Sequence, residues 1–570
     1  MCGIAGIIGT GAEESCLEKM LQKQQHRGPD FTGMWKEGMA ALGHNRLSIL
    51  DLSSNSNQPF ESNCGNYRLI FNGEIYNYIE LKEELSFYDF KTSSDTEVLL
   101  ASYLKWGKDC LKQLNGMFSF AIWNRKEESL FAARDRFGVK PFYYHNSEEA
   151  FYFASEIKTL HEANIPKKPN EAVWASYLAY GSYGMPNETF WDQIAQLAGG
   201  HYLEYKNKTL AINKWYFFEA AIEKLQQNKL SFEEAKAHYK KLLLDSIFIR
   251  FRADVAVGFN ISGGLDSSTL LAFVNQLEQG KNIEAYTFYT DDERYDELPW
   301  VEEMIGLTKN PLNKVLLSPD EKLVEKINAI IAVQDEPCGG VPTVAYSEIF
   351  KKARTQNTLV LLDGQGMDEQ WAGYDYYTQN NNNTIQGVSK SPFRPNILEA
   401  SFLKKAKKPK YPILFDDEVL NKQYRDLFYT KIPRALRFND RISMAYSTEL
   451  REPFLDYRLV EFAFAQPLEY KIKNGVQKYL LRELVAEYLS DSITYAPKRP
   501  LQTPQREWLG EELFTEIEKA VEHLKQSAIA GWFNFDELAK ELKNYKEGDR
   551  DASFHIWQWW NTSFLNTKSN

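Results

Sequence analysis

The sequence predicts a two-domain protein of mixed α/β and α+β class, whose second domain is built on a parallel sheet. The chain has 570 residues, which is too many for a single hydrophobic core. From about residue 232 onward, helical patterns alternate with short apolar strands. That alternation is typical of a parallel sheet with helices on both faces, which binds ligands beyond the carboxyl ends of its strands.

The composition is that of an ordinary globular protein, with 43% hydrophobic and 25% charged residues. A formal net charge of −11 argues against nucleic acid as a partner. No apolar run approaches the roughly 18 residues that span a bilayer, and the N-terminus lacks the pattern of a signal peptide. The five cysteines are scattered, so neither a disulfide framework nor a structural zinc site is expected. We expect a cytoplasmic protein that acts on small molecules, and the sequence leaves a homodimer open.

Cys2 becomes the N-terminal residue if Met1 is removed, and it then carries a free amine beside its thiol. The reference pKa values of these groups are about 7.7–8.0 and about 8.5, so the amine can accept the thiol proton near neutral pH. Nucleophile and base then belong to one residue, as in N-terminal threonine nucleophiles. An incidental cysteine is the alternative interpretation.

Four motifs follow Cys2 within the first hundred residues. They are His26-Arg27-Gly28-Pro29-Asp30, Gly43-His44-Asn45-Arg46-Leu47-Ser48-Ile49, Phe71-Asn72-Gly73-Glu74-Ile75-Tyr76-Asn77 and Ser94-Asp95-Thr96-Glu97. In order and spacing they resemble the class II glutamine amidotransferase domain. That resemblance implies an N-terminal-nucleophile hydrolase fold, an αββα sandwich. Taken alone, Asn72-Gly73 would also suit a hairpin turn.

The resemblance also implies a role for each site residue. Cys2 attacks the side-chain amide of glutamine, and Asn72 with the backbone N–H of Gly73 forms the oxyanion hole. The planar guanidinium of Arg46 pairs with the substrate carboxylate, while Glu74 and Asp95 hold its α-ammonium group. The implied glutamine-binding set is Arg46, Leu47, Ser48, Ile49, Leu50, Asn72, Gly73, Glu74 and Asp95.

Two further patterns lead toward the second domain. Phe118, Phe120 and Ile122 alternate with small or polar neighbours, which predicts a half-buried strand. Ser231 precedes a helical pattern whose first turn contains Glu233 and Glu234. A serine hydroxyl can bind free backbone N–H groups, so we expect Ser231 to cap that helix.

The stretch at 261–268 reads Ile-Ser-Gly-Gly-Leu-Asp-Ser-Ser, after an apolar segment at 255–261 and before a helical pattern at 269–274. Strand, glycine turn and helix in this order direct backbone N–H groups at an anion. No Gly-Lys-Ser/Thr follows, so this is not a Walker loop. It resembles the pyrophosphate loop of the ATP pyrophosphatases, which transfer AMP to a carboxyl or carbonyl oxygen. An ordinary glycine turn is the alternative.

Asp266 in this loop would be repelled by phosphate unless a divalent cation lay between them, which predicts a magnesium ligand. A second glycine-rich turn, Asp363-Gly364-Gln365-Gly366-Met367-Asp368, follows a predicted strand at 358–362. Since parallel strands end at one edge of their sheet, we expect both turns in one site. Asp266 and Asp368 would then share magnesium and pyrophosphate.

Two later segments, 436–445 and 449–456, extend the resemblance to glutamine-hydrolysing asparagine synthetases over nearly all of the chain. It implies a glutaminase domain at 1–215, a synthetase domain at 232–570, and ATP with Mg²⁺. It also implies that Lys498 is the catalytic lysine that stabilises the adenylate-forming transition state. The implied ATP-binding set is Asn260, Ser262, Gly263, Gly264, Asp266, Ser267, Ser268, Phe288, Asp363 and Gly364.

Several positions depart from that family, and all of them lie in the predicted synthetase site. Gln365 is neutral where the family has an acidic residue, and the segment Cys338–Thr343 is unusual. Asn260 and Phe288 stand where aliphatic residues are common. The charged residues at 437–456 fit a buried ion-pair network as well as a functional site.

The expected reaction converts aspartate, glutamine and ATP to asparagine, glutamate, AMP and pyrophosphate. Ammonia would pass through an apolar tunnel, because it would be protonated in water. The departures leave two alternatives open. One is the same chemistry on another carboxylate, such as a sugar uronic acid. The other is a regulatory or binding protein with an inactive synthetase site.

Overall fold

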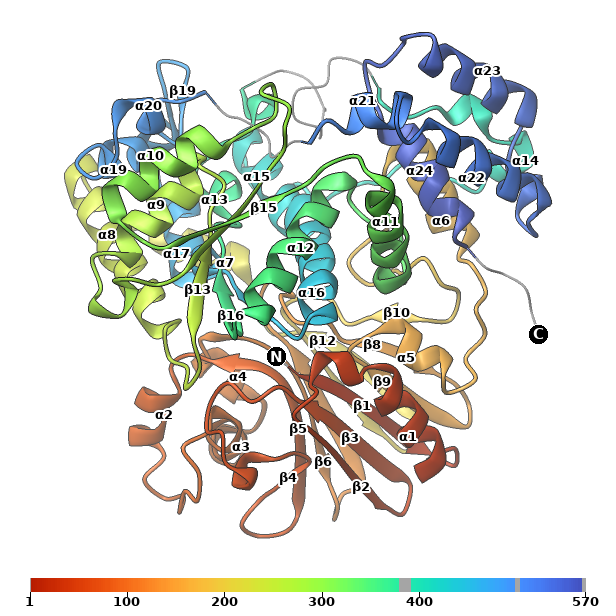
Figure 1. Cartoon of the computed structure of the whole chain (residues 1–570). Helices are drawn as coiled ribbons and strands as arrows, with labels where there is room; N and C mark the ends of the chain where they lie inside the picture. Colours follow the sequence, from red (N-terminus) through yellow and green to blue (C-terminus); the bar gives the residue numbers. More distant parts are fainter. Residues whose placement is uncertain (1, 379–390, 498–502, 566–570) are drawn as a thin grey trace.

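Two antiparallel six-stranded sheets build the N-terminal half, drawn in red and orange at the bottom of Figure 1. The computed structural model describes residues 2–378, 391–497 and 503–565. The first sheet contains β10 (Ala195–Gln196), β8 (Tyr143–Asn146), β9 (Ala150–Ala154), β1 (Gly3–Gly9), β3 (Ala40–Arg46) and β2 (Phe31–Glu37), in that order. The second contains β12 (Thr209–Lys214), β11 (His201–Lys206), β7 (Ser129–Arg134), β6 (Gly116–Asn124), β5 (Tyr67–Ile75) and β4 (Phe60–Glu61).

These sheets pack face to face with helices outside them. In β1, Ile4 and Ile8 lie between the sheets, whereas Ala5 and Ile7 face α1 (Glu14–Lys23) and α5 (Ile157–His161). This division follows from the two-residue period of a strand. Helices α2 (Tyr78–Glu84), α3 (Asp95–Trp106) and α4 (Cys110–Gln113) pack on the outer face of the second sheet. The predicted αββα sandwich is therefore confirmed.

Strand β6 differs from its sequence prediction. The alternation of Phe118, Phe120 and Ile122 suggested one solvent-exposed face, yet residues 117–123 are all buried. The three large side chains face the α2–α4 side, and Ala121 lies on the face between the sheets. The alternation reflects different packing partners on two buried faces.

The second half contains a five-stranded parallel sheet, as predicted. Its order is β15 (Leu312–Leu316), β14 (Ala285–Tyr289), β13 (Val257–Asn260), β16 (Val360–Leu362) and β17 (Glu449–Arg451). The apolar pattern had identified the three central strands. It missed β15, which is partly exposed, and β17, which has only three residues, two of them charged.

Helices cover both faces of this sheet. In β16, Leu361 faces α11 (Glu321–Gln334) and α12 (Val341–Thr355), whereas Leu362 faces α8 (Phe232–Ile249) and α9 (Leu265–Val274). Ser231 and Glu234 form a capping box at the start of α8, which confirms the predicted cap. The remaining helices and the small hairpin strands are α7 (Phe218–Gln226), α10 (Leu298–Thr308), α13 (Met367–Gln370), α14 (Ala400–Leu403), α15 (Glu418–Phe428), α16 (Lys431–Ala445), α17 (Tyr457–Ala465), α18 (Leu468–Lys471), β18 (Ile472–Lys473), β19 (Val476–Gln477), α19 (Tyr479–Val485), α20 (Asp491–Thr494), α21 (Gln505–Gly510), α22 (Phe514–Gln526), α23 (Phe535–Lys546) and α24 (Phe554–Ser563).

Helix α6 (Glu171–Tyr180) precedes β10 in the sequence but packs among the last helices of the chain, beside α24 in Figure 1. Trp174 and Tyr177 belong to the same buried cluster as Trp532 and Trp557. The amide of Gln558 donates to the carbonyl of Tyr177 at 2.5 Å. The Trp-rich segment near the C-terminus, Trp557–Trp560, therefore packs in the hydrophobic core.

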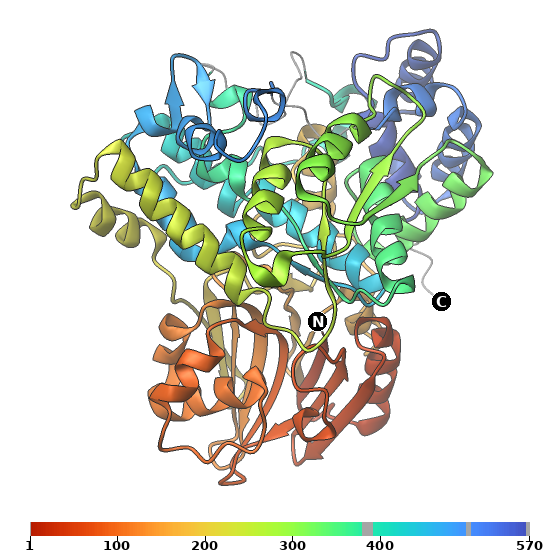
Figure 2. The same ribbon diagram turned by 60° about the vertical axis from the view of Figure 1, so that its left-hand side comes forward.

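One hydrophobic cluster spans the contact between the two halves, which Figure 2 shows from a second direction. It joins Phe71 and Phe118 of the N-terminal sandwich to Leu436 and Leu455 of the second half. Within the described ranges, none of the helices combines the length and the apolar character that crossing a membrane requires.

Candidate functional site: two active sites and their junction

Cys2 lies directly before β1, next to the middle of β5. Its backbone nitrogen donates to Oδ1 of Asn72 at 3.0 Å. The Nδ2 group of Asn72 is buried and has no hydrogen-bond partner among the described residues. A buried donor without a partner is uncommon and calls for an explanation. Here the unpartnered donor lies on the same side chain that accepts the Cys2 backbone N–H.

Asn72 and Gly73 lie inside β5, so they do not form the hairpin turn that the dipeptide alone allows. Gly73 has φ 154°, and a Cβ atom there would come within 2.1 Å of the Met117 carbonyl oxygen. Only glycine fits this approach to β6, so the strand pairing explains the residue.

The thiol of Cys2 is buried, and Sγ lies 3.9 Å from the Leu47 carbonyl oxygen. Burial raises the pKa of the Cys2 thiol, while the hydrogen bond to Leu47 and the nearby Arg46 guanidinium act in the opposite direction. A neutral thiol in this position needs a base beside it before it can attack.

Arg46 ends β3 and organises the loop that follows. Its Nη1 donates to the Ser53 carbonyl at 2.7 Å and to Oδ1 of Asn57 at 2.8 Å. Its Nη2 donates to the carbonyls of Leu50 and Asp51. The terminal nitrogens are thus occupied by the protein's own loop, and pairing with a substrate carboxylate stays a prediction. In the same loop Leu47 and Ile49 are buried, whereas Ser48 and Leu50 are partly exposed.

Asp95 and Glu74 lie on either side of the end of β5. Oδ2 of Asp95 accepts the Ile75 backbone N–H at 2.8 Å, and burial raises the pKa of Asp95 to about 6. Glu74 is also buried, and burial together with Glu449 raises its pKa above the usual value. Both carboxyl groups are therefore closer to neutrality than surface acids.

Residues of the second half reach these glutaminase positions. Arg451 in β17 lies 3.5 Å from Glu74 and 2.6 Å from Glu449. Asp254, in the loop before β13, donates its N–H to the Ile49 carbonyl at 2.9 Å and accepts the Asp51 N–H at 2.7 Å. The loop after β3, which contains predicted glutamine-binding residues, is thus held in place by a residue of the second half. No local sequence motif indicated this role for Asp254.

A cavity of about 180 Å³ opens at the carboxyl edge of the parallel sheet. It brings together most of the predicted ATP-binding residues, namely Ser262, Gly263, Gly264, Asp266, Ser267, Asp363 and Gly364, and it also contains the predicted metal ligand Asp368. Gly263 has φ 70°, and a Cβ atom there would lie 3.0 Å from the Val301 nitrogen. The glycine therefore permits both the turn and its contact with α10.

Three predicted ATP residues lie outside the lining of this cavity. Ser268 is fully buried in α9. The Nδ2 group of Asn260 donates to Oδ1 of Asp363 at 3.4 Å, and burial raises the pKa of Asp363 to about 6. The ring of Phe288 lies 6.2 Å from that of Tyr346, which does line the cavity. Lys498 lies outside the described residues.

Lys478 is the principal site residue that sequence reasoning missed. Its Nζ lies 2.6 Å from Oδ1 of Asp266 and 2.6 Å from Oδ1 of Asp368. It comes from the start of α19, more than a hundred residues from either aspartate, so no motif linked them. A Cβ atom on Gly373 would lie 2.1 Å from Asp368 Oδ1 and 2.2 Å from Lys478 Cε. The cluster therefore also requires glycine at that position.

The donor set at this cluster suits Mg²⁺. The described residues contain no group of three or more His, Cys, Asp or Glu placed to hold a metal. Mg²⁺ is commonly bound by one or two carboxylates together with substrate phosphates, so a richer protein cage is not required. Asp266 and Asp368 provide two hard oxygen donors on the wall of the cavity.

A cysteine at position 2 beside an unpartnered amide donor, together with a phosphate-type loop at a sheet edge, fits the class of glutamine amidotransferases fused to a synthetase. Known proteins agree with that class. Residues 1–216 match the glutamine amidotransferase domain, and residues 238–566 match the asparagine synthase domain. The chain therefore belongs to the asparagine synthase family. Members of this family are expected to use ATP.

Similarity to individual relatives extends over most of the chain. It is 31% identical to asparagine synthetase [glutamine-hydrolyzing] 3 of Bacillus subtilis (strain 168), covering 88% of this chain and 86% of the relative. It is 29% identical to asparagine synthetase [glutamine-hydrolyzing] 1 of that organism, covering 98% and 95%. A putative asparagine synthetase of Methanocaldococcus jannaschii is 36% identical, covering 66% and 76%.

Proposed function

We propose that this chain is a glutamine-hydrolysing asparagine synthetase, with glutaminase chemistry in residues 1–215 and synthetase chemistry in residues 232–570. Glutamine, ATP and aspartate are converted to glutamate, asparagine, AMP and pyrophosphate. The arrangement of Cys2 and Asn72 is the observation that carries the proposal, since it joins a nucleophile to an unpaired buried donor.

In the glutaminase half, the amine of Cys2 accepts the thiol proton and Sγ attacks the amide carbon of glutamine. The negative charge that develops on oxygen is stabilised by Asn72 Nδ2 and the Gly73 N–H. The C–N bond then breaks, ammonia leaves with the proton returned by the Cys2 amine, and water hydrolyses the thioester to glutamate. Asp95 and Glu74 bind the α-ammonium group of the substrate.

In the synthetase half, a carboxylate oxygen of the acceptor attacks the α-phosphorus of ATP, and pyrophosphate leaves. Ammonia then attacks the acyl carbon, and AMP leaves as the amide forms. Ser262, Ser267 and the glycine backbone bind the phosphates. The Lys478 ammonium balances the charge of Asp266, Asp368 and the departing pyrophosphate.

Mg²⁺ would be held by Asp266 and Asp368, and it neutralises phosphate charge when it is bound. The role of these two aspartates in Mg²⁺ binding can be tested without measuring turnover. Isothermal titration of Mg²⁺ with a non-hydrolysable ATP analogue should show tight binding to the unaltered chain and weak binding to Asp266→Asn. Equal binding by both would exclude this ligand.

The experiment that tests the function separates the two sites. Cys2→Ala should abolish glutamate formation from glutamine, because it removes the thiol that lies beside Asn72. Pyrophosphate release that depends on aspartate should persist when ammonium chloride replaces glutamine. Loss of both activities in a folded variant would contradict two separate sites joined by ammonia transfer.

A second acceptor remains a candidate because of one structural observation. Gln365 and the segment Cys338–Thr343, both unusual for the family, line a further and larger cavity beside the ATP site. The alternative of a binding protein without adenylation is disfavoured, since Asp266, Lys478 and Asp368 form a complete charged cluster.

A further inference from the structure

A second cavity, of about 600 Å³, adjoins the smaller one at the sheet edge. Both are lined by Tyr346, Gln365, Asp368, Glu369 and Tyr374. A molecule in the larger cavity can therefore present a carboxylate to ATP bound in the smaller one. Cavities of about 300–1,000 Å³ bind drug-sized ligands. Aspartate is far smaller than such ligands and would leave most of this space filled with water.

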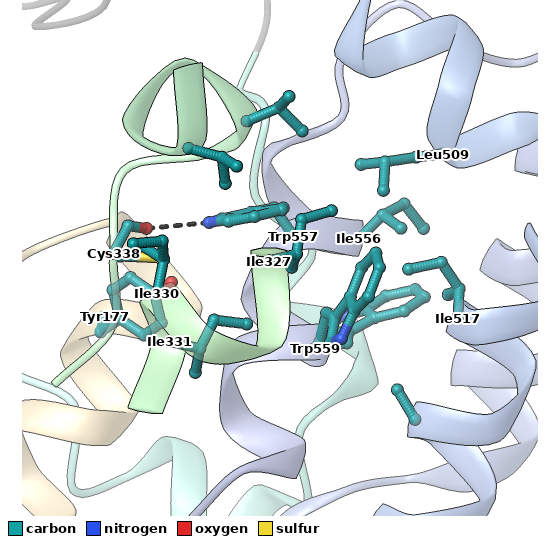
Figure 3. Close-up of a cluster of buried hydrophobic side chains, with 14 of the residues drawn as sticks. Tyr177, Ile327, Ile330, Ile331, Cys338, Leu509, Ile517, Ile556, Trp557 and Trp559 are labelled. Carbon is teal, nitrogen blue, oxygen red and sulfur yellow. Dashed lines mark hydrogen bonds between the residues drawn. The ribbon is translucent and has the colours of Figure 1, made fainter. Parts of the chain in front are cut away.

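The far wall of this cavity is buried and hydrogen-bonded. Figure 3 shows Cys338 next to Tyr177 and Trp557, within the buried cluster that joins α6, α11 and α24. The indole nitrogen of Trp557 donates to the Cys338 carbonyl at 2.8 Å. Cys338 N–H donates to Oδ1 of Asn561 at 3.0 Å. These contacts hold the unusual segment in place, so the cavity is a built feature of the fold.

Two cations on α16, Lys431 and Arg434, face the same cavity one helical turn apart. Neither has an ion pair or a hydrogen bond with another residue in the described part of the chain. The Lys431 ammonium lies 4.9 Å from the Tyr374 ring, and Arg434 lies 5.8 Å from the Tyr183 ring. Burial lowers the pKa of Lys431 to about 8, with Arg434 contributing. Such a pair is suited to an anionic ligand, which would relieve both charges.

Few groups on these walls could hold a free ammonium group. Among the described lining residues the carboxylates are Asp368, Glu369 and Asp551. Asp368 is paired with Lys478, and Glu369 accepts the hydroxyl of Tyr374 at 2.7 Å. Asp551 is exposed. Aromatic rings line much of the remainder, namely those of Tyr177, Tyr183, Phe393, Phe438, Phe554 and Trp557.

We infer that the acceptor site prefers an N-acylated acidic amino acid to aspartate itself: a carboxylate on a larger body, with a second anionic group and an apolar substituent. The inference rests on the proposed amidotransferase function and specifies its substrate class. One carboxylate of the acceptor attacks the α-phosphorus of ATP, releases pyrophosphate and receives ammonia. The second carboxylate lies between Lys431 and Arg434, and the acyl group packs on the aromatic wall.

The test compares N-benzyloxycarbonyl-L-aspartate with aspartate and with glucuronate, in the presence of ATP, Mg²⁺ and glutamine. Pyrophosphate release and the mass of the amide product are measured for each. We expect kcat/KM for the blocked aspartate to exceed that for aspartate at least tenfold, with glucuronate inactive. Activity with aspartate that equals or exceeds that with the blocked acid would overturn the inference and leave the proposed function intact. Glutaminase activity without pyrophosphate release from any acid would overturn both.

Variants of the cavity supply the structural control. Arg434→Gln should lower kcat/KM for the blocked aspartate by about 10–100-fold, as expected for loss of a charge-assisted hydrogen bond. Phe554→Ala, at a residue 42% exposed, should raise KM for the blocked acid more than KM for aspartate. Lys408→Gln, an exposed lysine outside the cavity, should change neither value. If Arg434→Gln lowered kcat/KM equally for both acids, Arg434 would not bind the second carboxylate of the acceptor.

Discussion

The amide of Asn72 accepts the Cys2 backbone N–H on Oδ1 and has no partner for Nδ2 among the described residues. We expect Asn72→Ala to lower the glutaminase kcat by about 10²–10³-fold, because one oxyanion donor is lost. Asn72→Asp keeps an acceptor for Cys2 but removes the donor, so it should lose as much. The measurement is glutamate release under saturating glutamine. Full activity of Asn72→Asp would show that Nδ2 does not bind the oxyanion.

Asp95 predicts a pH dependence. Burial raises the pKa of Asp95 to about 6, so its carboxyl group is charged above that pH and neutral below it. Only the charged form binds an α-ammonium group well. KM for glutamine should therefore rise as pH falls through about 6, whereas an ordinary aspartate would give that rise near 3.9. Initial rates across this range measure the effect, and Asp95→Asn should have a high KM with no such inflection.

At the scale of elements, the turn after α13 determines the charge cluster of the synthetase site. Gly373→Ala places a methyl group against Asp368 and Lys478, so we expect a large loss of acceptor-dependent pyrophosphate release. Glutamate release should remain, since the glutaminase residues lie in the other half. Gly306→Ala in α10 is the matched control, because no atom lies within 4 Å of its added Cβ. Similar losses in both variants would point to a general effect on folding.

Helix α16 contacts both the larger cavity of the second half and the N-terminal half. Lys431 and Arg434 face the larger cavity, and Asp440 binds Arg27 of the glutaminase half at 2.8 Å and 3.2 Å. The Nε of Arg27 donates to the Cys2 carbonyl at 3.0 Å. A shift of α16 on acceptor binding would therefore be transmitted to the nucleophile through buried charges.

At the scale of the whole molecule, the buried ion pair between Arg27 and Asp440 joins the two halves. Arg27 is fully buried, and Asp440→Asn removes one of its two carboxylate partners. We expect unfolding free energy to fall by about 3–5 kcal/mol, the range for a broken buried ion pair. The ratio of glutamate to pyrophosphate formed should rise as ammonia escapes. Glu37→Gln, in the exposed pair with Arg125, is the control and should leave the free energy of unfolding nearly unchanged. An unchanged product ratio in Asp440→Asn would exclude a coupling role.

Local patterns were sufficient for the regular elements that carry the sites. The capping box at Ser231, the central strands β13, β14 and β16, and the loop before α9 follow from residue spacing over a few positions. Strand β17 was missed because three residues give too short a period, and two of those three residues are charged. The exposure of β6 was misjudged for a related reason. Alternation of large and small side chains does not distinguish a solvent-exposed face from a second buried face.

By itself the sequence determined the two-domain class and the family, and it predicted Cys2 as the nucleophile and residues 261–268 as a phosphate loop. Each of these depends on residues close together in the chain or on motif order. Only the tertiary structure decided that Lys478 joins Asp266 to Asp368, that α6 packs against α24, and that Asp254 and Asp440 hold the glutaminase site. It also decided the size of the larger cavity. These features depend on contacts between segments separated by a hundred residues or more, and long-range packing leaves no local pattern from which to read them.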